Sequence, residues 1–189
     1  IYKLKVLNYE VLNKKLTSEI YDLKNKNKRG IHRSNKGGWH SQDFFVYQQS
    51  ATELQDISKI VSNFYSEKIL KNKKHVKVST IWANVNNKDN YNGPHAHGGS
   101  HYSGCYYVKV PKNSGNLYFI DRGTSLTPPF NQFRNIYDEI EIKPEEGVLY
   151  LWTGELGHRV GKNETDEDRI SISFNFDYLD LGKQLKEHE

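Results

Sequence analysis

The second half of this sequence alternates short apolar segments with clusters of turn residues, and this alternation limits the fold more than any other feature. No helix-length amphipathic stretch separates the segments after Lys74. Strands joined without intervening helices pair antiparallel, because parallel pairing needs a long crossover. We therefore predict a mainly β fold with flanking α, a double-stranded β-helix (jelly roll). Its expected strands are Val76 to Trp82, Tyr102 to Val110, Asn116 to Ile120, Glu139 to Ile142, Val148 to Trp152 and Arg169 to Phe176.

The first third of the chain has the periodicity of helices instead. Apolar residues recur at three- and four-residue spacing from Val11 to Leu23 and again from Leu54 to Ile69. Ser50 and Glu53 have the spacing of a capping box before the second stripe, and a short strand is expected over residues 44–47. A length of 189 residues fits one domain. We predict a single domain over residues 1–189, with an N-terminal helical part over about 1–75 packed on one side of a jelly-roll core over about 76–178.

Composition excludes several classes of protein. The net charge of +4 and the pI near 8.9 come largely from lysine clusters, but no nucleic-acid-binding motif accompanies them, so we expect no nucleic-acid partner. A single cysteine, Cys105, rules out an intrachain disulfide framework and a thiolate zinc cluster. No apolar run approaches the ~18 residues of a membrane span. We therefore expect a cytoplasmic protein without a membrane partner.

Histidines are the first candidates for chemistry. His95 and His97 are separated by one residue, and in an extended strand such residues point to the same face. His158 follows the apolar strand that ends at Trp152. Imidazole is a good ligand for divalent iron, zinc or copper. The sequence therefore predicts one metal site that contains His95, His97 and His158.

A second candidate lies on the last predicted strand. Arg169, Ser171 and Ser173 share one face of that strand, while the opposite face is apolar. A guanidinium on an inward face needs an anionic partner. A dicarboxylate cosubstrate would provide one, because the planar guanidinium binds carboxylates bidentately.

These motifs together carry a specific resemblance. The order His95-Ala96-His97, Ser103-Gly104-Cys105-Tyr106-Tyr107, His158 and Arg169-Ile170-Ser171-Ile172-Ser173 resembles that of Fe(II)/2-oxoglutarate dioxygenases of the prolyl-hydroxylase type. More closely, it resembles a group of 2-oxoglutarate oxygenases found in marine bacteria and phages. The resemblance implies that His95 and His158 bind iron and that Arg169 holds the distal carboxylate of 2-oxoglutarate. It also implies that Ser171 or Ser173 binds the same carboxylate and that Tyr107 lines the cosubstrate pocket.

One position departs from that pattern. The usual iron site has two histidines and a carboxylate, but His97 occupies the carboxylate position. Either His97 completes a three-histidine site, or Asp121 supplies the carboxylate as an alternative third ligand. Leu117, Phe119 and Asp121 share strand parity, so Asp121 can face the interior. The sequence leaves both ligands open.

The function implied by the resemblance is a 2-oxoglutarate- and Fe(II)-dependent dioxygenase, in which His95, His97, His158 and Arg169 are the catalytic residues. Its cofactors are Fe(II) and 2-oxoglutarate, it consumes O2, and it hydroxylates a peptide side chain or small metabolite that the sequence does not name. Two rivals remain: a three-histidine cupin-like metalloenzyme that does not use 2-oxoglutarate, and a non-catalytic jelly-roll binding module. A homodimer stays open, and the expected location is the cytoplasm of a bacterium, or of its host cell if the gene belongs to a phage.

Overall fold

A computed structural model describes residues 1–43, 60, 63–64, 67, 76–121 and 138–178. The strand expected over residues 44–47 and most of the second predicted helix lie outside these residues. Ile60 and Phe64, from that helix, are partly buried and pack against the core. Within the described residues, no helix is long and apolar enough to cross a membrane.

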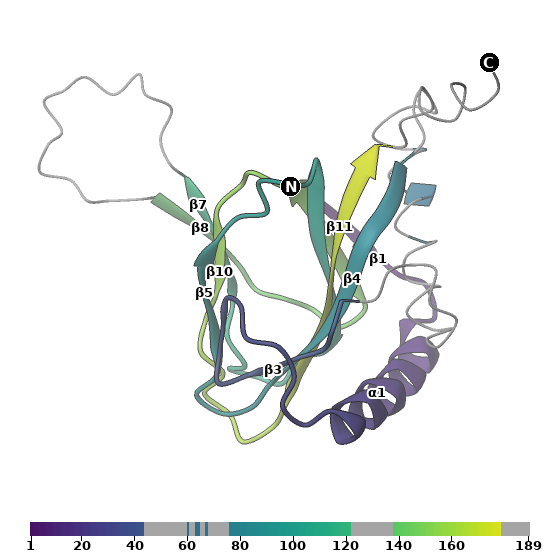
Figure 1. The fold of residues 1–189 in the computed structure, drawn as a ribbon, viewed down its shortest axis with the longest axis vertical. Helices are drawn as coiled ribbons and strands as arrows, with labels where there is room; N and C mark the ends of the chain where they lie inside the picture. Colours follow the sequence, from purple (N-terminus) through teal and green to yellow (C-terminus); the bar gives the residue numbers. More distant parts are fainter. Residues whose placement is uncertain (44–59, 61–62, 65–66, 68–75, 122–137, 179–189) are drawn as a thin grey trace, which may run out of the picture.

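Two antiparallel sheets face each other and form the jelly roll (Figure 1). The larger sheet has the order β1-β9-β6-β11-β4-β3. Its strands are β1 (Tyr2–Lys5), β9 (Val148–Thr153), β6 (Tyr102–Lys109), β11 (Arg169–Tyr178), β4 (Val76–Asn86) and β3 (Trp39–His40). The smaller sheet has the order β2-β5-β10-β7-β8. Its strands are β2 (Asn35–Lys36), β5 (Tyr91–His95), β10 (His158–Val160), β7 (Leu117–Asp121) and β8 (Asp138–Ile142).

The central strands β6 and β9 of the larger sheet are buried on both faces. One face packs against helix α1 (Tyr9–Lys26), whose Leu16 and Ile20 are fully buried. Side chains of the opposite parity, among them Tyr107, Tyr150 and Trp152, face the smaller sheet and form a second apolar cluster. Because successive side chains alternate between faces, β9 and β6 contribute to both clusters. The inner face builds the candidate site.

The structure confirms the predicted fold class, the first helix and the six predicted strands. One prediction needs correction. The N-terminal part is not only helical, because β1 pairs with β9, β2 with β5 and β3 with β4. Strands of two to four residues are too short to show a periodic pattern, which is why the sequence did not reveal them.

Candidate metal and cosubstrate site

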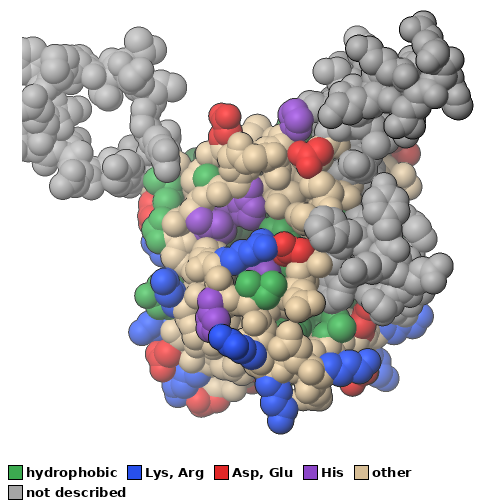
Figure 2. All heavy atoms as spheres, in the orientation of Figure 1, with side chains coloured by type: hydrophobic (Ala, Val, Ile, Leu, Met, Phe, Trp, Pro, Cys, Tyr) green, Lys and Arg blue, Asp and Glu red, His purple; other side chains and the backbone are tan. Residues whose placement is uncertain are grey.

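Three histidines meet at one end of the space between the sheets. His95 ends β5 and His158 begins β10, and the two residues are direct partners in the antiparallel ladder. Their ring centroids lie 4.3 Å apart, and the ring of His97 lies 5.1 Å from each of them. One nitrogen of each ring lies within 4.8 Å of the corresponding nitrogens of the other two. Figure 2 shows histidine side chains gathered around the hollowed part of this face.

His97 reaches this group by a different route from the one expected. β5 ends at His95, so the two residues do not share the face of a continuous strand. The backbone N–H of His97 instead donates to the carbonyl of Gly154, at 2.8 Å. A Cβ at position 154 would lie 2.0 Å from the carbonyl oxygen of Ser100 and 2.7 Å from that of His97. Gly154 therefore permits the close approach that places His97 beside its partners.

The surroundings keep the three imidazoles neutral. Burial, with a smaller contribution from the neighbouring His95, lowers the pKa of His158 to about 3 and that of His97 to about 4. Burial also lowers the pKa of His95. A neutral imidazole keeps a lone pair on one nitrogen, and three such nitrogens suit a divalent transition metal. Among the described histidines, cysteines and carboxylates, these three histidines lie close enough together to hold one metal ion.

Hydrogen bonds define which nitrogen can bind. Nδ1 of His95 lies 2.8 Å from the carbonyl oxygen of Gly93, and Nδ1 of His158 lies 2.9 Å from that of Leu156. A carbonyl only accepts, so each Nδ1 carries the proton and donates it. Nε2 of both rings is then left with a lone pair. This arrangement of the outer hydrogen bonds is typical of histidines that bind a metal.

Aromatic rings cover the histidines, although no motif in the sequence marks these rings. Trp82 on β4 stacks on His97, with centroids 5.7 Å apart and an interplanar angle of 18°. Trp152 on β9 meets His158 edge to face at 4.9 Å, and its indole Nε1 is buried without a partner in the structure. Strand parity could have placed both tryptophans on the inner face. Their contact with the histidines depends on how distant strands pair, which no local pattern reveals.

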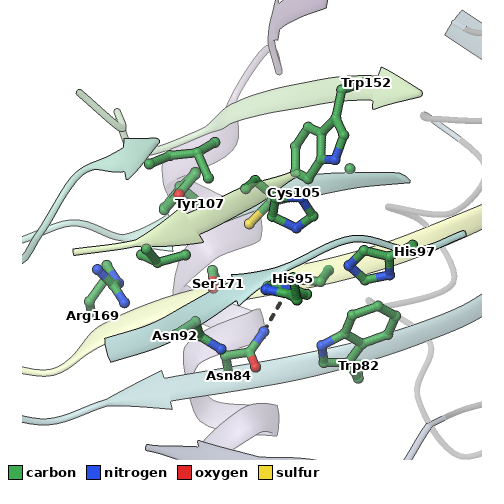
Figure 3. Close-up of a pocket in the computed structure, with 15 residues that line it drawn as sticks. Trp82, Asn84, Asn92, His95, His97, Cys105, Tyr107, Trp152, Arg169 and Ser171 are labelled. Atoms are coloured by element: carbon green, nitrogen blue, oxygen red, sulfur yellow. Dashed lines mark hydrogen bonds between the residues drawn. The ribbon is translucent and has the colours of Figure 1, made fainter. Parts of the chain in front are cut away.

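Arg169 lies at the other end of the same cavity (Figure 3). Its side chain is almost fully buried, at 1% exposure. Nη1 donates to the carbonyl oxygen of Ser114 at 2.6 Å and, at 3.3 to 3.4 Å, to those of Gly161 and Gly115. No carboxylate pairs with Arg169 in the part of the chain that the structure describes. A buried cation with only neutral acceptors leaves room for an anionic ligand.

Polar side chains connect the two ends of the cavity. Ser171 and Ser173 follow Arg169 on the same face of β11, and Tyr107 enters from β6. Burial raises the pKa of Tyr107 well above its ordinary value, so its phenol is a neutral hydrogen-bond donor. Asn84, which the sequence analysis did not single out, donates from Nδ2 to Ser173 Oγ at 3.2 Å, while its Oδ1 is buried without a partner. The predicted residues therefore line one cavity together.

Asp121 is the one predicted site residue that the structure does not place. Its backbone pairs with that of Asp138 at the end of β7, but its side chain lies outside the described residues. Phe119, two positions earlier, lies opposite His158 and faces the inner cluster.

Comparison with known proteins agrees with this geometry. The model of a family described as "Putative 2OG-Fe(II) oxygenase" matches residues 80–175, about half of the chain, and this span includes every candidate site residue. No curated protein matches the chain.

Solved structures share the fold at low sequence identity. A prolyl-4-hydroxylase from Pseudomonas putida superposes with a TM-score of 0.64 at 12% identity, covering 93% of this chain and 90% of that one. The collagen prolyl hydroxylase of Paramecium Bursaria Chlorella virus-1, solved with 2-oxoglutarate, gives 0.62 at 13% identity, covering 93% and 96%. The α-ketoglutarate-dependent epimerase SnoN from nogalamycin biosynthesis gives 0.66 at 12% identity, covering 93% and 76%.

Proposed function

The chain belongs to the family of 2OG-Fe(II) oxygenases, and we propose that it binds its iron through His95, His97 and His158. Fe(II) and 2-oxoglutarate are the metal and the cosubstrate of this family. We further propose that Arg169 binds the distal carboxylate of 2-oxoglutarate. Ser171 or Ser173 then donates a hydrogen bond to the same carboxylate, and Tyr107 lines the pocket beside it.

One observation carries this proposal: the two ends of a single cavity need opposite ligands. Three neutral imidazoles direct lone pairs toward one another at one end, and a metal cation would occupy that point. A buried guanidinium without a carboxylate partner lies at the other end. A dicarboxylate that contacts the metal with one end and Arg169 with the other satisfies both requirements.

The protein contributes position and shielding. Bound Fe(II), with 2-oxoglutarate and O2, supplies the oxidising chemistry, in which 2-oxoglutarate is converted to succinate and CO2. Arg169 holds its ligand in a buried pocket, where a charge-assisted hydrogen bond is stronger than in water. Trp82, Trp152 and Phe119 cover the histidines with apolar surface and keep bulk water away from them.

A three-histidine site has an electrostatic consequence. Replacing the usual carboxylate by a neutral imidazole leaves the metal centre with one more positive charge. A dianionic cosubstrate then neutralises the centre fully, so a loaded site with 2-oxoglutarate is favoured over the metal alone. Asp121 remains the alternative third ligand, and in that case the centre would carry one positive charge before the cosubstrate binds.

We propose that the reaction is hydroxylation of a peptide side chain or a small metabolite. Proteins with this fold act on both kinds of substrate, since the similar structures include a collagen prolyl hydroxylase and an epimerase from nogalamycin biosynthesis. The rival of a cupin-like enzyme without 2-oxoglutarate leaves Arg169 without a role, and a non-catalytic module leaves the histidines without one. A cytoplasmic location, a bacterial or phage origin and a homodimeric state stay predictions from the sequence.

Succinate formation tests the proposed function. The wild-type protein, incubated with Fe(II), 2-oxoglutarate and O2, should form succinate slowly even without its substrate, and a chelator should abolish this. The His95→Ala variant serves as the metal-free control. Oxidation that proceeds equally well without 2-oxoglutarate would favour the cupin-like rival instead.

A further inference from the structure

The strand ladders arrange part of the cavity lining in rows that run from the histidine end to the arginine end. On β4 and β11, Asn86 is the ladder partner of Arg169, and Trp82 is the ladder partner of Ser173. Trp82 also stacks on His97, so its row marks the histidine end. Residues two positions apart on a strand are separated by roughly 6–7 Å. The row between these two therefore lies beside any ligand that reaches from the metal to Arg169.

The middle row consists of three polar side chains from adjacent strands. Ser171 on β11 is the ladder partner of Asn84 on β4 and, on its other side, of Tyr107 on β6. All three side chains line the cavity, and Figure 3 shows Asn84 between Trp82 and Arg169. The proposed cosubstrate pocket uses Ser171 and Tyr107 but gives Asn84 no role.

The carboxamide of Asn84 has unused hydrogen-bonding capacity. The side chain is buried, and its Nδ2 donates to Ser173 Oγ at 3.2 Å. Its Oδ1 is buried as well and has no hydrogen-bond partner among the described residues, which is unfavourable for a polar atom. Asn92, in the same cavity, differs, because its Oδ1 accepts from Asn86 at 3.4 Å and its Nδ2 donates to Ser34 Oγ at 3.3 Å. Of these two asparagines, Asn84 is the one left with a group for a ligand to satisfy.

2-Oxoglutarate can use this capacity only if the amide of Asn84 donates. The two carboxylates and the keto group of this ligand are acceptors, so a polar group in contact with them must supply an N–H or an O–H. Nδ2 and Oδ1 are similar in size, so a half-turn of the amide exchanges them without displacing a neighbour. Ser173 Oγ then donates to Oδ1, because a hydroxyl can both donate and accept. After this exchange Oδ1 has a partner, and Nδ2 is free to donate to the ligand.

We propose that Asn84 binds 2-oxoglutarate by donating from its amide to the carboxylate at the metal end. That carboxylate has two oxygens, and the oxygen that does not contact the metal needs a donor in a buried cavity. Arg169 serves the distal carboxylate, and Asn84 lies one row nearer to the histidines than Arg169 does. The inference rests on the proposed cosubstrate pocket. It adds a contact at the end of the ligand that Arg169 does not reach.

Titration of the Mn(II)-loaded protein with 2-oxoglutarate measures this contact without catalysis. A hydrogen bond to a charged group changes affinity by about 10- to 100-fold, so Asn84→Ala should weaken the binding of 2-oxoglutarate by this factor. Asn84→Asp should weaken it at least as much at alkaline pH, because a negative charge replaces the donor. Asn92→Ala is the matched control and should bind as wild type does, since both polar atoms of Asn92 have partners. Metal analysis and circular dichroism should show that all variants hold Mn(II) and are folded.

A second ligand locates the contact along the cavity. 2-Oxovalerate keeps the keto-acid end of 2-oxoglutarate but has a methyl group in place of the distal carboxylate. Asn84→Ala should weaken the binding of both ligands by the same factor. Arg169→Ala should weaken the binding of 2-oxoglutarate alone, because Arg169 meets the end that the two ligands do not share.

Four outcomes would overturn the inference. Asn84→Ala could bind 2-oxoglutarate as wild type does, or Asn84→Asp could do so, which would show that the amide does not donate. Asn92→Ala could lose as much affinity as Asn84→Ala, which would show that both asparagines serve packing. An effect of Asn84→Ala on 2-oxoglutarate but not on 2-oxovalerate would move the contact to the distal end.

Arg169→Ala separates these failures from failure of the proposed function. If Arg169→Ala keeps wild-type affinity for 2-oxoglutarate, the cosubstrate pocket itself is wrong, and the role of Asn84 falls with it. If Arg169→Ala loses affinity while Asn84→Ala does not, the pocket stands and Asn84 has no part in it.

Discussion

The two ends of the cavity differ in how they use charge. At the histidine end, burial keeps three titratable rings neutral, and two of them satisfy their N–H groups with main-chain carbonyls. At the arginine end, a buried guanidinium keeps its charge and meets main-chain carbonyls from the turns at Ser114, Gly115 and Gly161. One end suits a cation and the other suits an anion.

This difference shows that the two ends can be tested separately. A change at the histidine end should remove the metal, whereas a change at the arginine end should weaken the binding of the cosubstrate and leave the metal in place. If substitutions at both ends had the same effect on metal and cosubstrate, the assignment of the two ends to two different ligands would be wrong.

The largest effect is expected at the histidine end. His95→Ala or His158→Ala should abolish stoichiometric iron binding, because each removes one nitrogen of a three-nitrogen group. His97→Ala should lose iron as severely, while Asp121→Ala should retain it. Metal analysis after anaerobic loading and gel filtration gives the readout. Full iron occupancy in His95→Ala and His158→Ala would disprove the site, and the reverse pattern for His97 and Asp121 would assign the third position to Asp121.

At the arginine end, Arg169→Ala should weaken the binding of 2-oxoglutarate without loss of iron. Removing one partner of a buried charge pair costs about 3–5 kcal/mol, which is roughly two to four decades of affinity. Arg169→Lys should recover only part of this, because an ammonium keeps the charge but not the planar fork. Isothermal titration of the Mn(II)-loaded variants measures the affinity. Wild-type affinity in Arg169→Ala would remove the main support for the cosubstrate pocket.

Substitution of the two serines tests which of them also binds the carboxylate at the arginine end. A hydrogen bond to a charged group contributes about 1.5–3 kcal/mol. Replacing the serine that binds the carboxylate by Ala should therefore lower the affinity for 2-oxoglutarate by about 10- to 100-fold. Either serine could donate, because Ser173 Oγ accepts from Asn84 and its O–H is still free to donate to a carboxylate. Ser171→Ala and Ser173→Ala are therefore each other's control in the same titration. Equal, negligible effects would mean that Arg169 acts without either serine.

A smaller effect is expected on the stability of the metal-free protein. The folded-state pKa is about 3 for His158 and about 4 for His97, below their ordinary value of 6.5. The unfolded chain therefore binds more protons between about pH 6.5 and pH 4, and stability should fall as the pH falls through this window. Melting curves of His158→Gln should depend less on pH there than those of wild type, while replacement of the exposed His32 by Gln should change little. An unchanged pH dependence in His158→Gln would contradict the buried, neutral state of this ring.

Much of the fold could be predicted, because it follows from repeated local patterns. The alternation along β4, β6, β9 and β11 and the stripe of α1 each involve enough residues to show their period. The strands β1, β2, β3, β5 and β10 have two to five residues each. They form because neighbouring strands offer unpaired backbone groups. Which strands are neighbours depends on the tertiary structure, so a local sequence pattern does not predict these short strands.

The candidate site divides in the same way. His95, His97, His158, Arg169 and the serines stand in recognisable motifs, and the structure lines one cavity with them. Trp82 and Trp152 contact the histidines only because β4 and β9 carry them to the same place. Strand geometry alone does not bring His95 and His97 together, since β5 ends at His95 and the backbone contact with Gly154 places His97.

One measurement tests the central claim most directly: a crystal structure of the anaerobic protein loaded with Fe(II) and 2-oxoglutarate, with anomalous data at the iron edge. The account predicts one iron peak at bonding distance from a nitrogen of each of His95, His97 and His158. It also predicts the distal carboxylate of 2-oxoglutarate against the guanidinium of Arg169. An iron peak away from these histidines, or 2-oxoglutarate bound without contact to Arg169, would contradict it.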